Sequence, residues 1–164
     1  GIELEFIARP TDQLRLSANG AYIDAKIDTL SAEEAAISGA VDGVRLAAPK
    51  FSGSASATYT VPVGDTEEAF ATGSVSYVGS YPGLFPNVPG QPGVQSPQYD
   101  VTEAYTFANC YAGVRFTRDF SVTAYVENVF DNDAITYVHP EAFLDGRYAR
   151  LQPRTFGVRT SLAF

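Results

Sequence analysis

The chain has 164 residues and a formal net charge of −8, and 45% of its residues are hydrophobic. This length suits about one domain. Acidic residues outnumber basic ones 19 to 11, which argues against a nucleic-acid-binding surface. No apolar run approaches the ~20 residues that a membrane-spanning helix needs, so a helical membrane protein is excluded. A single cysteine, Cys110, leaves no internal disulfide framework.

Seven segments alternate apolar and polar residues with a period of two, which predicts β-strands. In the clearest segment, Phe51, Ala55 and Tyr59 share one face while Ser52 and Ser56 share the other. No charged residue falls on the apolar face of any segment. The segments are residues 2–8, 14–22, 51–61, 71–77, 108–116, 121–127 and 155–164. We therefore predict an all-β, antiparallel, up-and-down sheet.

The polar faces of these segments carry mostly Ser and Thr, whereas the solvent face of a soluble sandwich usually carries many charges. This composition fits the water-lined interior of a transmembrane β-barrel, with the apolar face and Cys110 toward lipid. The few charged side chains are expected to face the interior and to pair with neighbouring groups. They are Glu3, Glu5, Arg15, Arg115, Glu127 and Arg159. A soluble β-sandwich binding domain and a small self-contained structural or adhesion barrel remain as alternatives.

The connections between the segments alternate in length. Residues 10–13, 62–67 and 117–119 are short, whereas residues 24–49, 80–102 and 131–152 are long and rich in Gly, Pro and acidic residues. In an antiparallel meander all short turns lie at one end, as in outer-membrane barrels with short periplasmic turns and long extracellular loops. Bacterial single-chain barrels have an even number of strands. Because seven is odd and the alternation starts at the first residue, we expect residues 1–164 to be part of a larger barrel.

Residues 125–132, Tyr-Val-Glu-Asn-Val-Phe-Asp-Asn, resemble the Asn-Leu-Phe-Asp motif near the end of TonB-dependent outer-membrane receptors, with Val129 in place of the usual Leu. In that family a loop follows, a Pro-Arg pair opens the last strand, and the strand ends in an aromatic residue. The matching residues here are Asn128, Phe130, Asp131, Pro153, Arg154 and Phe164.

The resemblance implies that the chain is the C-terminal portion of a 22-stranded barrel in the bacterial outer membrane. Such receptors are plugged by an N-terminal domain and are driven by TonB. They import iron–siderophore complexes, other metal chelates, cobalamin, haem or carbohydrates. The implied partners are the lipid bilayer, the plug domain, TonB, the barrel-assembly machinery and a small-molecule nutrient. Neither plug nor TonB box lies within residues 1–164. Nucleic acid, cofactors and a metal site are not expected.

Substrate contacts are expected from aromatic and basic residues of the two later long loops, because rings and guanidinium groups suit an anionic ferric chelate. The candidates are Tyr81, Phe85, Tyr99, Tyr137, His139, Arg147, Tyr148 and Arg150. We favour loop packing over substrate contact for this set. His139 with Glu141 is weak evidence for a metal site, since no second His exists.

Three further residues have expected roles at strand ends. Asn128 and Asp131 are short polar residues where a strand gives way to a loop, so we expect them to cap and turn the backbone. Phe164 resembles the terminal aromatic that the barrel-assembly machinery reads, although it also suits membrane anchoring. No nucleophile–base pair or phosphate-binding loop is present in the sequence, so an enzyme is not expected.

Overall fold

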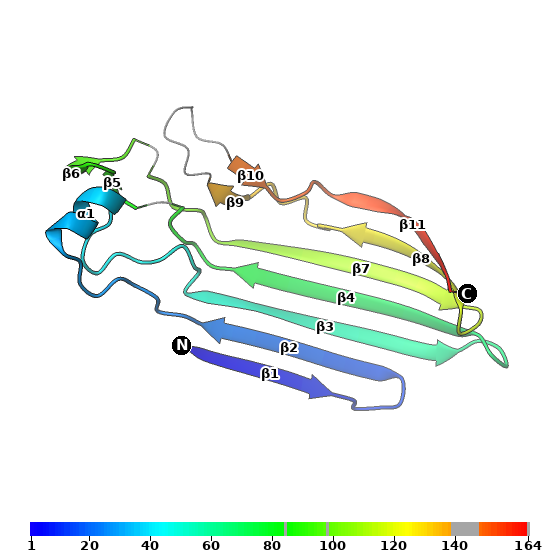
Figure 1. Ribbon diagram of the computed structural model, residues 1–164. Helices are drawn as coiled ribbons and strands as arrows, with labels where there is room; N and C mark the ends of the chain where they lie inside the picture. Colours follow the sequence, from blue (N-terminus) through cyan, green and yellow to red (C-terminus); the bar gives the residue numbers. More distant parts are fainter. Residues whose placement is uncertain (84, 98, 139–147, 164) are drawn as a thin grey trace.

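The computed structural model describes residues 1–83, 85–97, 99–138 and 148–163. Its main element is one antiparallel sheet in which seven long strands pair in chain order (Figure 1). The predicted all-β, up-and-down arrangement is confirmed. The strands are β1 (Ile2–Ala8), β2 (Leu14–Tyr22), β3 (Phe51–Pro62), β4 (Glu68–Val78), β7 (Tyr105–Arg115), β8 (Phe120–Glu127) and β11 (Thr155–Leu162). Within the described residues the sheet is open, with β1 and β11 at its edges.

Five short elements occupy the long connections, at the opposite end of the sheet from the short turns (Figure 1). The sequence pattern did not predict them. They are helix α1 (Ala32–Ser38), the hairpin of β5 (Asn87–Val88) and β6 (Gln91–Gln95), and the hairpin of β9 (Ile135–Val138) and β10 (Tyr148–Arg150). No helix in the described ranges is long and apolar enough to cross a membrane.

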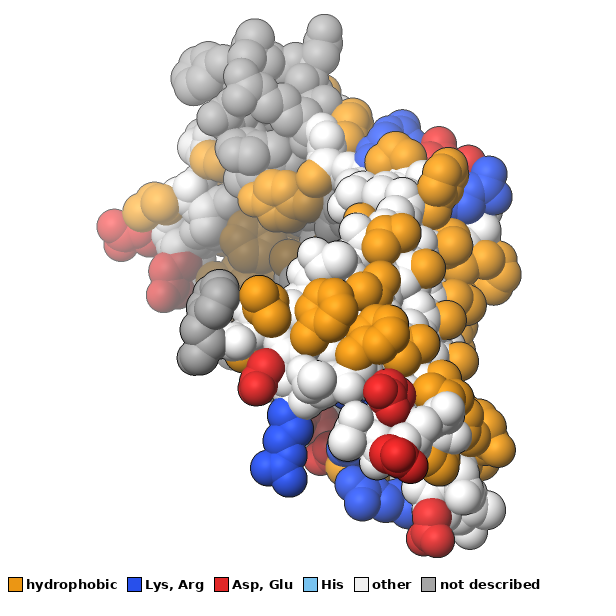
Figure 2. All heavy atoms as spheres, turned by 90° about the vertical axis from the view of Figure 1, so that its right-hand side faces the viewer, with side chains coloured by type: hydrophobic (Ala, Val, Ile, Leu, Met, Phe, Trp, Pro, Cys, Tyr) orange, Lys and Arg blue, Asp and Glu red, His pale blue; other side chains and the backbone are white. Residues whose placement is uncertain are grey.

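The pairing register places the apolar faces of all seven strands on the same side, and Val75 opposite Ala108, Cys110 opposite Val126 and Val126 opposite Phe156 extend the match to β7, β8 and β11. Along one row across the sheet, Leu4 lies opposite Gly20, Gly20 opposite Gly53, and Gly53 opposite Tyr77. Because side chains alternate along a strand, one row of matched residues fixes the face of every other position. Viewed from the short-turn end, hydrophobic side chains run as a band along one side of the molecule (Figure 2). We call this side the outward face.

The outward face has no second layer of protein over it among the described residues. Leu4 is 73% exposed and Phe156 is 77% exposed. The accessible surface is 10829 Å², whereas a compact monomer of this mass would expose about 7,900 Å². A β-sandwich buries the apolar faces of two sheets against each other, so the sandwich alternative does not describe this sheet.

The opposite, inward face is held together by hydroxyl and amide side chains. Hydrogen bonds join Ser17 to Ser56 at 2.8 Å and Thr58 to Thr72 at 3.0 Å between the hydroxyl oxygens. The Asn19 amide donates to the Ser54 hydroxyl at 3.0 Å. These cross-strand bonds satisfy polar groups on a face that carries few charges.

Two arginines of the inward face lie over aromatic rings that in turn cover glycines of the neighbouring strand. The Arg115 guanidinium carbon is 4.9 Å from the Phe70 ring centre, and that of Arg159 is 5.5 Å from the Tyr125 ring centre. A Cβ at Gly157 would lie 2.8 Å from the Tyr125 hydroxyl oxygen, so a larger residue there would displace this ring.

Further partners of the inward charges come from neighbouring strands. Arg115 forms an ion pair with Glu68 at 3.1 Å, and the Tyr111 hydroxyl donates to Glu127 at 3.1 Å. The expected pairing of Arg115 and Glu127 with neighbouring groups is therefore observed.

Candidate functional site

The three long connections gather at one end of the sheet (Figure 1), and hydrogen bonds join the first to the second and the second to the third. We call residues 23–50 loop 1, residues 79–104 loop 2 and residues 128–154 loop 3. All the substrate-contact candidates belong to loops 2 and 3. This end is therefore the candidate functional site, and the contacts between the loops determine its shape.

Loop 1 carries helix α1, which is capped at both ends. The Ser31 hydroxyl accepts from the Glu34 N–H at 3.2 Å, while the Glu34 carboxylate accepts from the Ser31 N–H at 2.9 Å and from its hydroxyl at 2.7 Å. This capping box satisfies N–H groups that the first helical turn leaves free. The hydrogen bonds from the Ser31 backbone and hydroxyl lower the pKa of the Glu34 carboxyl below its usual value. Gly39 ends the helix with φ 73°.

Loop 1 and loop 2 are joined through the C-terminal end of this helix. The Asn87 N–H donates to the Gly39 carbonyl at 3.0 Å, and the Gly90 N–H donates to the Ala36 carbonyl at 2.5 Å. A Cβ at position 39 would collide with the Asn87 carbonyl oxygen, so this contact also requires glycine. Ala40, directly after the cap, is 1% exposed.

Loop 2 is joined to loop 3 through Tyr81, one of the predicted substrate contacts. Its hydroxyl donates to the Thr136 carbonyl, and its own carbonyl accepts from the Thr102 N–H at 2.9 Å. Burial raises the pKa of the Tyr81 phenol. Val138, 1% exposed, packs on Gly83, where an added Cβ would lie 2.5 Å from the Val138 Cβ. Tyr81 therefore makes an internal loop contact.

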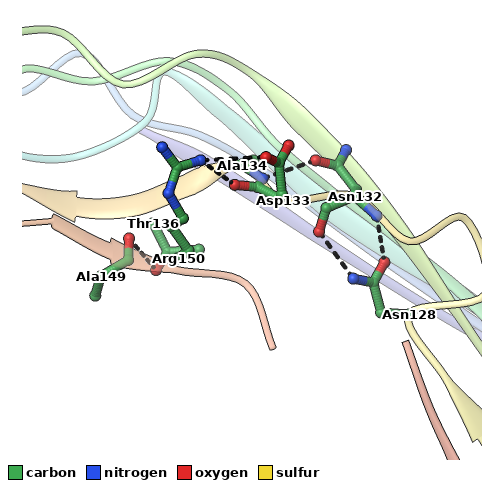
Figure 3. Close-up of polar contacts among 7 residues, drawn as sticks. All are labelled: Asn128, Asn132, Asp133, Ala134, Thr136, Ala149 and Arg150. Carbon is green, nitrogen blue, oxygen red and sulfur yellow. Dashed lines mark hydrogen bonds and ion pairs between the residues drawn. The ribbon is translucent and has the colours of Figure 1, made fainter. Parts of the chain in front are cut away.

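Loop 3 is anchored at its root by Asn128, which is 4% exposed and has φ 50° (Figure 3). Its amide donates to the carbonyls of Asn132 at 2.8 Å and Gln152 at 2.9 Å, and its side-chain oxygen accepts from the Asn132 N–H at 3.0 Å. Its own N–H donates to the Asn109 side chain at 2.9 Å. One buried side chain therefore joins the end of β8 to the segment that leads into β11.

Asp131 makes a second set of contacts at the start of loop 3, with an exposed side chain and a positive φ of 54°. Its carboxylate accepts from the Arg154 N–H at 2.9 Å and lies 3.8 Å from the Arg154 guanidinium. Pro153 immediately precedes this contact. Asn and Asp tolerate the left-handed region better than most residues. The motif residues thus lie together at the junction of β8, loop 3 and β11, with Phe130 63% exposed.

The remaining candidates lie in several environments. Tyr137 and Tyr148 are each 48% exposed in the β9–β10 hairpin, while Phe85 and Tyr99 in loop 2 are half-buried. Arg150 lies in β10 beside Asp133 (Figure 3). His139, Arg147 and Phe164 lie outside the described residues, as do Glu141 and the contact between His139 and Glu141 that a metal site would need.

The five basic side chains described in the long loops all have oxygen partners. Arg150 donates to the Asp133 carbonyl at 2.8 Å, and its guanidinium lies 3.3 Å from the Asp133 carboxylate. The Arg45 guanidinium lies 3.4 Å from the carbonyls of Ala48 and Ser80. The other three are Arg154, paired with Asp131, and Lys26 and Lys50, which share Asp24. An anionic ligand would have to compete with these partners.

Asp24 shows the electrostatic effect of such pairing. Its carboxylate lies 3.3 Å from the Lys26 ammonium and 3.5 Å from that of Lys50. The hydrogen bond from Lys26, followed by its charge, holds the pKa of Asp24 below its usual value. In the described parts of the chain, no group of three or more His, Cys, Asp or Glu side chains is placed to hold a metal ion.

A polar hollow of about 320 Å³ lies between loops 2 and 3. Its lining includes Asp100, Glu103, Asp133 and Arg150, with Val138 on its apolar side. The sequence reasoning missed this hollow, because its walls come from loop segments that are far apart in the chain. Among the predicted contacts, Arg150 lines it.

Comparison with known families matches residues 1–129 to the model described as "TonB dependent receptor-like, beta-barrel". No curated protein matches the chain significantly.

Solved structures match over nearly the whole chain. The ferric yersiniabactin uptake receptor from Yersinia pestis is 20% identical, with a TM-score of 0.71, 99% of this chain covered and 23% of that chain. A mutant ferric enterobactin receptor from Pseudomonas aeruginosa, in complex with enterobactin, is 19% identical, with a TM-score of 0.66 and coverage of 99% and 22%. The closed form of the ferric-catecholate import receptor from E. coli K12 is 19% identical, with a TM-score of 0.62 and coverage of 99% and 20%.

At these identities the likeness concerns the fold. This chain spans between a fifth and a quarter of the length of each of these receptors.

Proposed function

Because this chain belongs to the family of TonB-dependent receptor-like β-barrels, we propose that it is the C-terminal portion of the barrel of an outer-membrane receptor that imports a scarce nutrient, with an iron–siderophore complex as the leading candidate. Members of this family are outer-membrane proteins. The rest of the barrel, the plug domain and the contact with TonB would come from parts of the protein outside residues 1–164.

The observation that carries this proposal is an uncharged outward face that continues across all seven long strands. The two edge strands, β1 and β11, have no outer partner among the described residues. In hydrocarbon each unsatisfied backbone N–H or C=O group costs several kcal/mol, so a sheet in a membrane must close. Further strands that pair with β1 and β11 would satisfy both edges. A partial barrel of a large receptor meets this requirement, because other strands of the receptor can pair with β1 and β11. A self-contained seven-stranded barrel would have to pair β1 with β11, and these strands form the two open edges of this sheet.

The nutrient class is proposed from two features. The named receptors with the same fold take up ferric yersiniabactin, bind enterobactin and import ferric catecholates. In this chain Tyr137 and Tyr148 expose about half of their side chains at the long-loop end, where they could stack on the rings of a chelate. Phe85, Tyr99, His139, Arg147 and Arg150 remain proposed contacts, and Tyr81 would act through loop packing.

The test of transport uses the full-length gene. A deletion strain should lose energy-dependent uptake of radioactive iron presented as one of several ferric chelates, and the full-length gene should restore it. A double variant, Tyr137→Ala with Tyr148→Ala, should raise the chelate concentration needed for half-maximal uptake, while receptor abundance stays unchanged. Unchanged uptake of every chelate in the deletion strain would rule out iron transport by this protein.

The partial-barrel assignment has a separate test. Residues 1–164 expressed alone and refolded in detergent should fail to give a closed barrel that resists heat in gel electrophoresis. A monodisperse, heat-resistant barrel formed by this chain alone would contradict the proposal. Phe164 is proposed as the assembly signal, and Phe164→Asp in the full-length receptor should then lower its abundance in the outer membrane.

A further inference from the structure

The inward face contains the same arrangement of ring, glycine and arginine twice. In each case an aromatic ring lies over the glycine directly opposite it on the next strand of the sheet, and the arginine two residues after that glycine lies over the ring. The β4–β7 unit consists of Phe70, Gly113 and Arg115, and the β8–β11 unit consists of Tyr125, Gly157 and Arg159. An added Cβ would lie 2.9 Å from the first ring and 2.8 Å from the hydroxyl oxygen of the second, so both rings lie close against glycine backbone.

The two units differ in the residue directly opposite the arginine. Glu68 lies opposite Arg115, and the two side chains form an ion pair at 3.1 Å. Thr123 lies opposite Arg159 and carries no charge. Within the described parts of the chain, the Arg159 guanidinium contacts the Tyr125 ring but has no ion pair and no hydrogen bond. The β4–β7 unit is therefore closed by a carboxylate of this chain, whereas the β8–β11 unit is open.

The two strands of the open unit offer no spare carboxylate. Glu127 is the one acidic residue of β8, and it accepts from the Tyr111 hydroxyl at 3.1 Å. The sequence of β11 contains no acidic residue. A guanidinium that lies over a ring uses its flat face, so its N–H groups remain available at its edge. Five donors in a fixed planar fork suit the two oxygens of a carboxylate.

We propose that Arg159 is a carboxylate-binding site of the barrel interior, and that its partner is an Asp or Glu side chain from the part of the receptor outside residues 1–164. In this reading Tyr125 and Gly157 are positioning residues that hold the guanidinium in place. The inference rests on the proposed partial barrel but not on any transported nutrient. It also predicts an asymmetry, because Arg115 already has Glu68 and needs no partner from outside this chain.

Two arguments favour a partner within the same receptor over an anionic nutrient. This chain covers only 23% of the yersiniabactin receptor that shares its fold, so most of the residues that could enter the interior lie outside it. An unpaired guanidinium surrounded by protein carries a large desolvation cost. A permanent partner removes that cost at all times, whereas a passing nutrient would remove it only briefly.

The closed unit is the matched control for a crosslinking test in the full-length receptor, reconstituted in vesicles without any chelate. Arg159→Lys and Arg115→Lys keep the positive charge and add a primary amine. A water-soluble carbodiimide activates a carboxylate, the lysine nitrogen attacks it to form an amide, and the displaced oxygen leaves in the urea by-product. Mass spectrometry of the joined peptides should show position 115 linked to Glu68 and position 159 linked to an acidic residue outside residues 1–164.

A charge reversal checks the same pair independently. Arg159→Glu should lower the abundance of the heat-resistant receptor, and replacing the crosslinked acid by Arg should restore it. Arg115→Glu should instead be restored by Glu68→Arg. If Arg159→Lys does not reach the heat-resistant form, a photoreactive phenylalanine analogue in place of Thr123, directly opposite Arg159, should crosslink to the same outside segment.

Two results would overturn the inference. A crosslink from position 159 to an acidic residue of this chain would mean that the β8–β11 unit closes on itself. No crosslink at position 159, while position 115 joins Glu68, would mean that Arg159 faces water. A receptor that imports no iron would contradict only the proposed nutrient, since the crosslinks are read without a chelate. A closed barrel formed by residues 1–164 alone would contradict the partial barrel in the refolding test, whatever the crosslinks of the full-length protein.

Discussion

The seven-stranded sheet and the long-loop end of this chain differ in where their side chains are buried. Every described residue classed as buried lies outside the seven long strands: Gly39, Ala40, Gly79, Pro82, Thr102, Asn128 and Val138. The strands hold only half-buried and exposed residues. The loop end therefore has its own small core, whereas the sheet has none.

The two regions consequently depend on different stabilising forces. The loop end is held by contacts within the chain, such as Asn128 with Gln152 and Tyr81 with Thr136. The sheet is held by its backbone ladders and needs surroundings for both faces, which lipid and the rest of the receptor would supply. A substitution in the sheet should therefore change stability according to the surroundings that the new side chain faces. A substitution in the loop end should change stability according to the partner that is lost.

The largest effect is expected from a charge at the centre of the outward face. Ala57 lies opposite Leu16 and Gly73 in the middle rows of the sheet. Ala57→Arg in the full-length receptor should lower the free energy of folding into vesicles by about 2–4 kcal/mol, because a guanidinium would enter hydrocarbon. Denaturant titration of the reconstituted receptor measures this loss.

The matched control for this prediction is Ala149→Arg in β10, which is exposed at the long-loop end. It should change the folding free energy by less than about 0.5 kcal/mol. Equal effects of the two substitutions would mean that the outward face does not contact lipid, and the contrast between the two regions would disappear.

The second effect concerns the buried root of loop 3. Asn128→Gly keeps the backbone at φ 50° but removes three side-chain hydrogen bonds. Because the Asn132 N–H and the carbonyls of Asn132 and Gln152 would lose their partners at a part-buried site, we expect a loss of about 1–3 kcal/mol. Hydrogen exchange at the ends of β8 and β11 in the full-length receptor locates the loss.

Asp131→Gly is the control, since Asp131 has a similar φ of 54° but an exposed side chain. Its effect should be the smaller of the two. If Asp131→Gly were as damaging as Asn128→Gly, burial of the amide would not be the source of the stability.

The third effect is local. Tyr81→Phe removes the hydroxyl that donates to the Thr136 carbonyl and should weaken the junction of loops 2 and 3 by about 1 kcal/mol. Faster hydrogen exchange of residues 135–138 should report it, with no change in the strands. Tyr59→Phe, which alters an outward tyrosine that is 52% exposed, should leave exchange in both regions unchanged.

The sheet was predictable from the sequence because a period of two is a local signal that each strand carries by itself. The alternation from Phe51 to Val61 shows its faces before any partner strand is known, and matching the apolar faces then sets the register. Helix α1 was missed, although Ser31 with Glu34 and the following Gly39 are the usual signs of a capped helix. Seven residues were too few to show a helical period.

The arrangement of the loop end could not be predicted in this way. Its contacts join residues such as Tyr81 and Thr136, which are far apart in the chain and carry no periodic pattern. Tyr81 was chosen as an aromatic loop residue, yet its hydroxyl is used inside the loops. The positions of Asn128 and Asp131 at a turn were predictable, because these residue types favour turns. The burial of Asn128 could not be predicted, because it depends on the fold.

The smallest effect is a pH dependence confined to loop 1. The two hydrogen bonds from Ser31 lower the folded-state pKa of Glu34 below 4.5. Their contribution to helix α1 is therefore complete above pH 4.5 and is lost as the pH falls through the lowered folded-state value. Exchange of residues 31–38, corrected for intrinsic rates, should accelerate over this window in the full-length receptor, while the β3–β4 ladder stays protected. Glu34→Gln has no titratable group there and should remove the acceleration. If acid opened the sheet before loop 1, the pH dependence would not be confined to the loop end.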